Sequence, residues 1–161
     1  YSRTVILPDT AIKTLNGNLF YHDTAFSGKL LEKWPNGNVQ SVQLYTNGKQ
    51  QGLSETFYFN GAKESLRWYN NGEKDSVHTG WWESGNKKYE YHFKNGVYDG
   101  LFTEWYQAGN MMQQVMYQNG QEQYGKGWRE NGKVYMNFVM KNGRRYGMNN
   151  SNLCYGLKSL K

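Results

Sequence analysis

The apolar residues between positions 28 and 147 do not recur with the period of about 3.6 residues that marks a helix. They fall instead in runs of about 7 to 9 residues separated by glycine-containing turns, a length typical of strands. Only two prolines interrupt the chain. Side chains in a strand alternate between two faces, and aromatic residues occupy both alternations here. The pattern therefore predicts strands with rings on both faces.

The dipeptide Asn-Gly marks the turns and occurs nine times. It is the preferred pair for a two-residue type I′ hairpin turn, because both central residues need positive φ and these two reach it at least cost. Ser84-Gly85 and Ala108-Gly109 occupy two further places in the same series. The nine pairs begin at Asn16, Asn36, Asn47, Asn60, Asn71, Asn95, Asn119, Asn131 and Asn142.

These turns recur with a period of 24 residues. Gly48, Gly72, Gly96 and Gly120 lie 24 positions apart, and Gly143 follows at 23. A second series precedes each of these glycines by 11 positions and consists of Gly37, Gly61, Gly85, Gly109 and Gly132. A period of this size indicates an array of similar supersecondary units.

The predicted fold is all-β: an elongated, single-layer antiparallel meander of about 11 strands, in which each 24-residue repeat forms one β-hairpin. Residues 1–27 are expected to form an N-terminal lead with a half repeat around 17–27, and residues 148–161 a basic C-terminal tail. The fifth repeat has lost one residue. The five repeats occupy residues 28–51, 52–75, 76–99, 100–123 and 124–146.

The turns also predict the strand register. With Asn36-Gly37 as a two-residue turn, Trp34 lies opposite Val39 and Gly28 lies opposite Tyr45. With a longer loop at TNGKQQG (46–52), each aromatic-x-Asn-Gly-x-x-x-Gly segment places a ring over a glycine of the neighbouring strand and shields its backbone. The expected pairs are Tyr21–Gly28, Tyr45–Gly52 and Phe93–Gly100, with Tyr69–Ser76 and Met140–Gly147 as variants.

Composition changes the picture in one respect. Leu, Ile, Val and Phe supply only 29 residues and the mean hydropathy is −0.92, values typical of disordered chains. The 6 Trp, 14 Tyr and 7 Phe argue against disorder, because rings bury large areas and favour strands. No apolar run approaches about 18 residues, so no membrane-spanning helix is expected.

The net charge of +6 comes entirely from the C-terminal end. Residues 1–130 contain 13 Lys/Arg and 13 Asp/Glu, and no acid follows Glu130. We expect the excess to form a basic patch on the last hairpin that could dock an anionic surface. The six basic residues are Lys133, Lys141, Arg144, Arg145, Lys158 and Lys161.

Two repeats, GLSETFYFNGAKESLRWYNNGEKD (52–75) and GLFTEWYQAGNMMQQVMYQNGQEQ (100–123), resemble the MORN repeat in the bacterial variant form found in proteins labelled as YwqK-type antitoxins. The resemblance covers residues 28–147. It implies an elongated antiparallel sheet that acts as a scaffold, and some members are proposed to touch anionic phospholipids. Others accompany catalytic domains, but only 27 residues precede this array and 14 follow it, so we expect no such domain.

No catalytic, cofactor or metal site is expected. His22, His78 and His92 lie more than ten residues apart without metal-ligand spacing, which favours strand-surface positions. Cys154, the single cysteine, lies in no nucleophile motif and forms no internal disulfide. All six methionines lie between 111 and 148 and could ligate a soft metal, but strand alternation divides them between two faces.

Two surfaces are candidates for binding. One is the set of rings on both faces, which could stack on sugars or bases or grip a peptide. The other is the basic end. The candidate residues are Trp81, Trp82, Trp105, Trp128, Lys133, Lys141, Arg144 and Arg145, with Trp82 sharing a face with Trp34, Tyr58 and Tyr106, and Trp81, Trp105 and Trp128 sharing the other with Phe57.

The predicted function is that of a non-enzymatic scaffold or binding module, which presents an extended aromatic β-surface to a macromolecular partner. The favoured partner is another protein. Peripheral binding of anionic phospholipid or polysaccharide through the basic end stays open, as do antitoxin-type neutralisation and soft-metal binding. Nucleic acid is not expected, because so short a basic patch would bind it in a salt-labile way. The aromatic, Asn- and Gly-rich composition suggests a bacterial envelope or secreted protein, with a cytoplasmic location open. The sequence leaves the oligomeric state undetermined.

Overall fold

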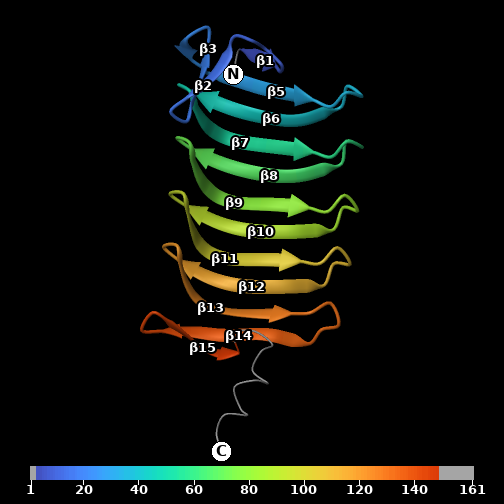
Figure 1. Ribbon diagram of the computed structural model, residues 1–161, viewed down its shortest axis with the longest axis vertical. Helices are drawn as coiled ribbons and strands as arrows, with labels where there is room; N and C mark the ends of the chain where they lie inside the picture. Colours follow the sequence, from blue (N-terminus) through green and yellow to red (C-terminus); the bar gives the residue numbers. More distant parts are fainter. Residues whose placement is uncertain (1–2, 149–161) are drawn as a thin grey trace, which may run out of the picture.

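The computed structural model describes residues 3–148, and this part of the chain is built from strands and turns alone. A 12-stranded sheet runs in the order β1-β5-β6 and onward to β15, and β2-β3-β4 form a separate 3-stranded sheet. Strands β5 to β15 are the predicted antiparallel meander of 11 strands, which is confirmed. In Figure 1 they lie one below the other as a single layer. No helix long and apolar enough to cross a membrane occurs among these residues.

The strands have these bounds. The N-terminal ones are β1 (Thr4–Ile6), β2 (Ile12–Leu15), β3 (Asn18–Tyr21) and β4 (Thr24–Ala25). The meander comprises β5 (Gly28–Lys33), β6 (Val39–Thr46), β7 (Lys49–Phe57), β8 (Lys63–Asn70), β9 (Glu73–Trp81), β10 (Lys87–Lys94), β11 (Val97–Trp105), β12 (Met111–Gln118), β13 (Gln121–Trp128), β14 (Val134–Lys141) and β15 (Arg144–Met148).

The two glycine series form two kinds of connection, one at each end of the strands (Figure 1). At the tight turns, as between Thr46 and Lys49, two residues are enclosed and both have positive φ, 49° for Asn47 and 79° for Gly48. These are type I′ turns. At the wide loops three residues are enclosed: the Trp34 amide donates to the Asn38 carbonyl (2.8 Å), and of loop residues 34–38 only the glycine has positive φ. The prediction had exchanged the two connections.

A β-bulge lies beside each wide loop. Lys33 pairs with Val39 and Glu32 with Ser41, so Gln40 is an extra residue and the predicted Trp34–Val39 pair is wrong. A wide loop of this type leaves the strands one residue out of step, and the bulge absorbs the difference. The extra residues are Gln40, Glu64, Lys88, Met112 and Tyr135, here called the bulge column.

A larger bulge lies near the start of β7, β9 and β11, just after the tight turn that precedes each of these strands. Tyr45 pairs with Gln50 and Gln43 with Ser54, so β7 has two more residues than β6 over this stretch. Gly52, with φ of 85°, lies in the bulge and pairs with Tyr69 of the following strand. The glycine is needed for its backbone conformation.

Ring-opposite-glycine pairs occur mainly across the wide-loop hairpins, and the exception among residues 3–148 is Phe138–Gly147, across the last tight turn. The predicted Gly28–Tyr45 pair is confirmed. The predicted pairs Tyr21–Gly28, Tyr45–Gly52, Tyr69–Ser76, Phe93–Gly100 and Met140–Gly147 are wrong. In the three middle cases a two-residue turn pairs the strands at once, and Gly52, Ser76 and Gly100 fall in the bulge that follows. Gly28 and Gly147 pair instead with Tyr45 and Phe138. The observed pairs are Gly28–Tyr45, Gly52–Tyr69, Ser76–Phe93 and Gly100–Tyr117.

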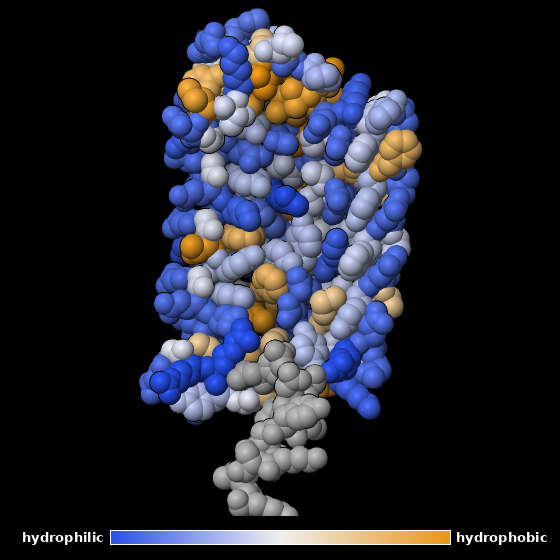
Figure 2. Space-filling view, viewed as in Figure 1, coloured by the Kyte–Doolittle hydropathy of each residue, from blue (hydrophilic) through white to orange (hydrophobic). Residues whose placement is uncertain are grey.

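The N-terminal end of the sheet is covered. Strand β1 pairs with β5 in parallel, and Val5, Leu19, Phe26 and Leu30 form a buried cluster in which Phe26 is 1% exposed. Hydrophobic side chains gather at this end in Figure 2, while hydrophilic ones predominate over the rest of that view. The opposite edge, β15, carries no such cover within residues 3–148.

Candidate functional site

The two faces of the sheet differ in burial. One face, here called the tyrosine face, carries Tyr45, Tyr69, Tyr91, Phe93, Phe102 and Tyr117 and holds most of the buried residues of the meander, among them Ser54, Ser65, His78, Val115 and Phe138. The other, the tryptophan face, carries Phe57, Trp81, Trp105 and Trp128. In a single layer, only neighbours on the same face can bury a side chain, so large rings packed along the tyrosine face bury one another.

Stacked rings form the centre of the tyrosine face. Tyr91 lies 4.1 Å from Phe102 and 4.5 Å from Tyr89 between ring centroids, with interplanar angles of 13° and 16°. Its hydroxyl donates to Glu104 at 2.5 Å, and Gln113 donates to the same carboxylate at 2.7 Å. Burial and the Glu104 carboxylate raise the pKa of Tyr91 far above its ordinary value, so the phenol stays protonated.

Rings beside the wide loops connect successive repeats. The indole of Trp34 donates to the Phe57 carbonyl at 3.0 Å, and the Tyr58 hydroxyl donates to the Trp81 carbonyl at 2.8 Å. Trp82 and Tyr106 repeat the contact, to the carbonyls of Trp105 (3.1 Å) and Trp128 (3.0 Å). This ladder of four donors holds neighbouring loops together and gives Trp82 a structural role.

The larger cavity of the tyrosine face is acidic and aromatic. It has a volume of about 570 Å³, and Glu32, Glu64 and Glu83 line it beside the rings of Trp34 and Tyr58. None of the three carboxylates forms an ion pair within the described part of the chain. Burial, followed by Glu64 and Glu83, raises the pKa of Tyr58. A cavity of this size can hold a side chain or a small ligand.

The smaller cavity is basic and aromatic. It has a volume of about 210 Å³ and is lined by Arg67, Lys74, His78, Tyr89, Tyr91, Phe93 and Tyr98. The imidazole Nε2 of His78 lies 2.7 Å from the Trp68 carbonyl, and the side-chain nitrogen of Lys74 lies 5.1 Å from the Phe93 ring centroid. The same face thus carries two hollows of opposite charge.

The structure divides the predicted aromatic candidates between the two faces. Trp81, Trp105 and Trp128 are half-buried on the tryptophan face, where Lys87 and Lys126 each lie 5.4 Å from an indole centroid. Trp82 lies on the side of the tyrosine face, with Lys88 4.5 Å from its ring. The four tryptophans therefore do not form one binding surface.

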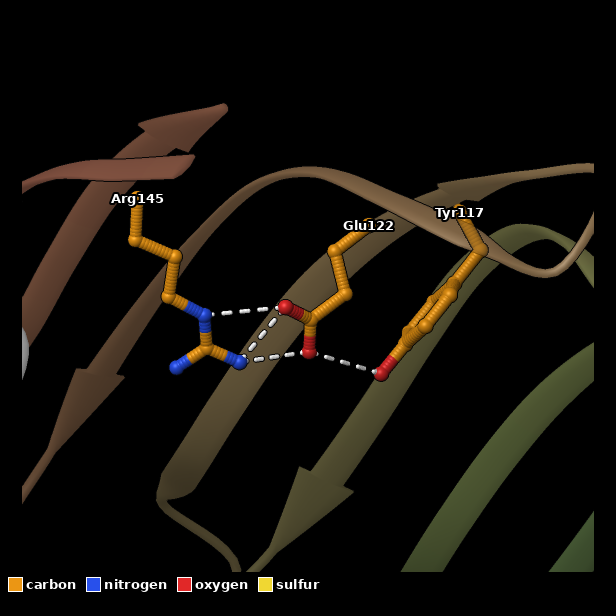
Figure 3. A network of polar contacts seen from close by, with 3 residues as sticks. All are labelled: Tyr117, Glu122 and Arg145. Atoms are coloured by element: carbon orange, nitrogen blue, oxygen red, sulfur yellow. Dashed lines mark hydrogen bonds and ion pairs between the residues drawn. The ribbon is translucent and has the colours of Figure 1, made fainter. Parts of the chain in front are cut away.

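The predicted basic residues are also divided. Lys133 lies beside the last wide loop, at the opposite end of β14 from Lys141 and Arg144. Arg145 forms an ion pair: it donates to Glu122 through Nε (2.9 Å) and through one terminal nitrogen (2.6 Å), and its guanidinium lies 4.2 Å from the Phe138 centroid. Figure 3 shows Glu122 between Arg145 and Tyr117. Arg145 is thus not a free cation of the expected basic patch, because it lies in β15 and faces a carboxylate of the preceding repeat.

The other candidates form no reactive set. His78 is 3% exposed, so its predicted surface position is wrong. His92 contacts Glu90 at 3.6 Å, and the His22 ring lies 4.4 Å from that of Tyr21. Residues 3–148 contain no group of three or more His, Cys, Asp or Glu side chains that could hold a metal. Cys154, Lys158 and Lys161 lie outside the described residues.

Sequence reasoning missed the bulge column and the two cavities. Gln40 and Glu64 line the larger cavity, Lys88 lies on Trp82, and the ring of Tyr135 covers Gly127. The signal was present as a 24-residue spacing of these positions, but simple alternation places them on the wrong face. Only the bulge turns these side chains onto the tyrosine face.

Comparison of the chain with protein-family models and with curated proteins finds no match.

Proposed function

We propose that the protein is a non-catalytic binding module whose tyrosine face holds a polypeptide partner. The observation that carries this proposal is the chemistry of the bulge column. At one geometric position the successive repeats place an amide, a carboxylate, an ammonium, a thioether and a phenol, in Gln40, Glu64, Lys88, Met112 and Tyr135.

A polymer of identical units would be met by identical chemistry in each repeat. Equivalent residues lie two strands apart, or about 9.6 Å at the usual strand spacing of about 4.8 Å. A partner that meets a different chemical group at each such step must itself vary along its length, as a polypeptide does. The acidic and basic cavities on the same face support this proposal, because they present opposite charges to one bound chain.

Panning a phage-displayed library of random peptides on the immobilised protein tests the proposal. We expect recovered peptides to share a motif and to bind the Glu64→Lys variant at least tenfold more weakly, since Glu64 is exposed at the acidic cavity. The matched control is Trp68→Ala, which removes a ring that is 42% exposed on the tryptophan face. Peptides that bind Glu64→Lys as well as wild type but lose affinity for Trp68→Ala would contradict the proposal.

Docking to an anionic phospholipid or polysaccharide surface through the basic end is a second candidate. Lys141 and Arg144 flank the last tight turn, are exposed, and form no ion pair within residues 3–148. Vesicles with and without anionic lipid test it: the Lys141→Glu/Arg144→Glu double variant should lose salt-sensitive binding that the wild type shows. Equal binding of both proteins at low salt would exclude the basic end.

The resemblance to bacterial MORN repeats is compatible with a scaffold of this kind. The antitoxin-like role that the resemblance suggests stays a prediction, as does the envelope location suggested by the composition.

A further inference from the structure

We propose that the smaller cavity of the tyrosine face is an oxyanion site, in which Arg67 and Lys74 hold a carboxylate side chain of the bound polypeptide. The inference rests on the proposed function, because it names the chemical group that this part of the face recognises. It concerns an internal basic site and not the basic C-terminal end.

The first observation is the charge of the lining. Arg67, Lys74 and His78 are the ionisable nitrogen-bearing residues of the cavity, and its remaining lining residues are aromatic. No lining residue is an acid, whereas a half-buried arginine is usually paired with a carboxylate. The site therefore gathers positive charge that the protein does not neutralise within the cavity.

The second observation is the state of Arg67. Its side chain is half-buried, and it forms no ion pair within the described part of the chain. Its polar contacts are with two phenols, Tyr89, whose hydroxyl lies 3.4 Å from a terminal nitrogen, and Tyr69. A guanidinium carries five N–H donors in a planar fork that fits a carboxylate with two parallel hydrogen bonds. Phenols satisfy part of that fork only, so the rest is available to a ligand in the cavity.

The third observation is the size of the cavity and the aromatic residues that form its walls. A volume of about 210 Å³ suits a single side-chain group better than a larger molecule. The Phe93 ring beneath Lys74, 5.1 Å from its nitrogen, fixes the ammonium at the rim, and Phe93 itself stacks on Tyr98 at 4.7 Å. Aromatic rings on the walls lower the local polarity, which strengthens a charge-assisted hydrogen bond inside the cavity.

His78 lies at the floor of the site and can report on occupancy. Burial is the main cause that lowers its pKa, and Lys74 and Arg67 lower it further. A bound carboxylate would offset those two cations, so the pKa of His78 should rise on binding. The side chains that face His78 are those of Arg67 and Tyr69 of β8, Lys74 of its own strand, and Tyr91 and Phe93 of β10, and the backbone of Asp75 also contacts its ring.

The test uses NMR titration of the full chain with an acetylated, amidated tetrapeptide of alternating Asp and Glu. The control peptide replaces these residues with Asn and Gln. We expect saturable shifts of the His78 ring signals and a raised His78 pKa with the acidic peptide alone. Equal binding of the uncharged peptide, or a His78 signal that does not move, would overturn the site.

Variants locate the effect. Arg67→Gln should weaken the acidic peptide at least tenfold, the loss expected for one charge-assisted hydrogen bond. Lys74→Gln, at an exposed position that should fold normally, should weaken it to a smaller extent. Lys126→Gln, at an exposed position beside Trp128 on the tryptophan face and outside the cavity, is the matched control and should bind like wild type. Unchanged affinity in both cavity variants would contradict the proposal.

Two further outcomes separate the alternatives. Inorganic phosphate that shifts the His78 signals at lower concentration than the acidic peptide does would refute a carboxylate as the ligand and identify a phosphate group instead. If panned peptides bind the tyrosine face and the acidic tetrapeptide does not bind, the proposed oxyanion site is refuted. The proposed function is not affected by that result.

Discussion

The ladder of ring donors beside the wide loops predicts a measurable cost for removing one hydroxyl. Tyr58→Phe deletes only the oxygen that donates to the Trp81 carbonyl at 2.8 Å, and Tyr106→Phe deletes the donor to the Trp128 carbonyl at 3.0 Å. A net hydrogen bond of this kind contributes about 0.5 to 1.5 kcal/mol, so each variant should lose about 1 kcal/mol of the free energy of unfolding.

The double variant makes the prediction sharper. The two tyrosines lie two repeats apart, at about 19 Å from the strand spacing, so their effects should add to about 2 kcal/mol. Urea unfolding followed by far-UV circular dichroism measures this loss as a lower midpoint at an unchanged slope. Tyr124→Phe is the matched control, because its ring is 50% exposed and its hydroxyl makes no hydrogen bond within residues 3–148. The ladder would be refuted if Tyr58→Phe and Tyr106→Phe unfold at the same urea concentration as Tyr124→Phe.

Three further predictions concern the fold and its charges. Gly96→Val should cost about 1 to 3 kcal/mol, because φ is 80° there, whereas Gly96→Asn should cost much less; equal urea midpoints would contradict the type I′ turn. Arg145→Glu should destabilise the last hairpin by about 1 kcal/mol or more, since it breaks the paired contact to Glu122, while Arg144→Glu should change stability by less than about 0.5 kcal/mol; thermal melts of both variants decide this. Burial, then Glu122, raises the pKa of Tyr117 to about 12. Its contribution to stability is thus complete below the unfolded pKa of about 10 and is lost as the pH rises toward 12, so urea midpoints should fall over that window more in wild type than in Tyr117→Phe.

The period of the sequence was enough to predict the architecture. The Asn-Gly pairs at 24-residue intervals predicted the 11 antiparallel strands of the meander, because turn chemistry is local and a two- or three-residue connection brings consecutive strands side by side. The strands that cover the N-terminal end of the sheet could not be predicted from this period. Residues 18–25 belong to a separate sheet, and β1 pairs in parallel, through contacts between residues distant in the sequence such as Val5 and Leu30.

The register could not be predicted from the same signal. Asn-Gly serves a type I′ turn at Asn47 and a type I turn with a left-handed glycine at Asn36, and the dipeptide is identical in both. The choice depends on how the flanking strands pair, which is a tertiary property. Each bulge then reverses the alternation of side chains, so the face on which Glu64 or Lys88 lies cannot be read from parity.

The sequence predicted that aromatic side chains form the candidate site, but it did not predict the cavities. Rings on both faces were expected, but the charge of the larger cavity depends on residues brought together from three successive repeats, Glu32, Glu64 and Glu83. The basic end was overestimated for a similar reason. Composition counts Arg145 as a free cation, whereas the structure pairs it with Glu122, 23 positions earlier in the chain.

The central claim, that partners bind the tyrosine face, can be tested most directly with the indole signals of the six tryptophans. Trp34 and Trp82 lie on the side of the tyrosine face, and the tryptophan face carries Trp68, Trp81, Trp105 and Trp128. In a ¹⁵N-labelled sample titrated with a panned peptide, the signals of Trp34 and Trp82 should shift while the other four stay in place. Shifts confined to the four indoles of the tryptophan face would contradict the account.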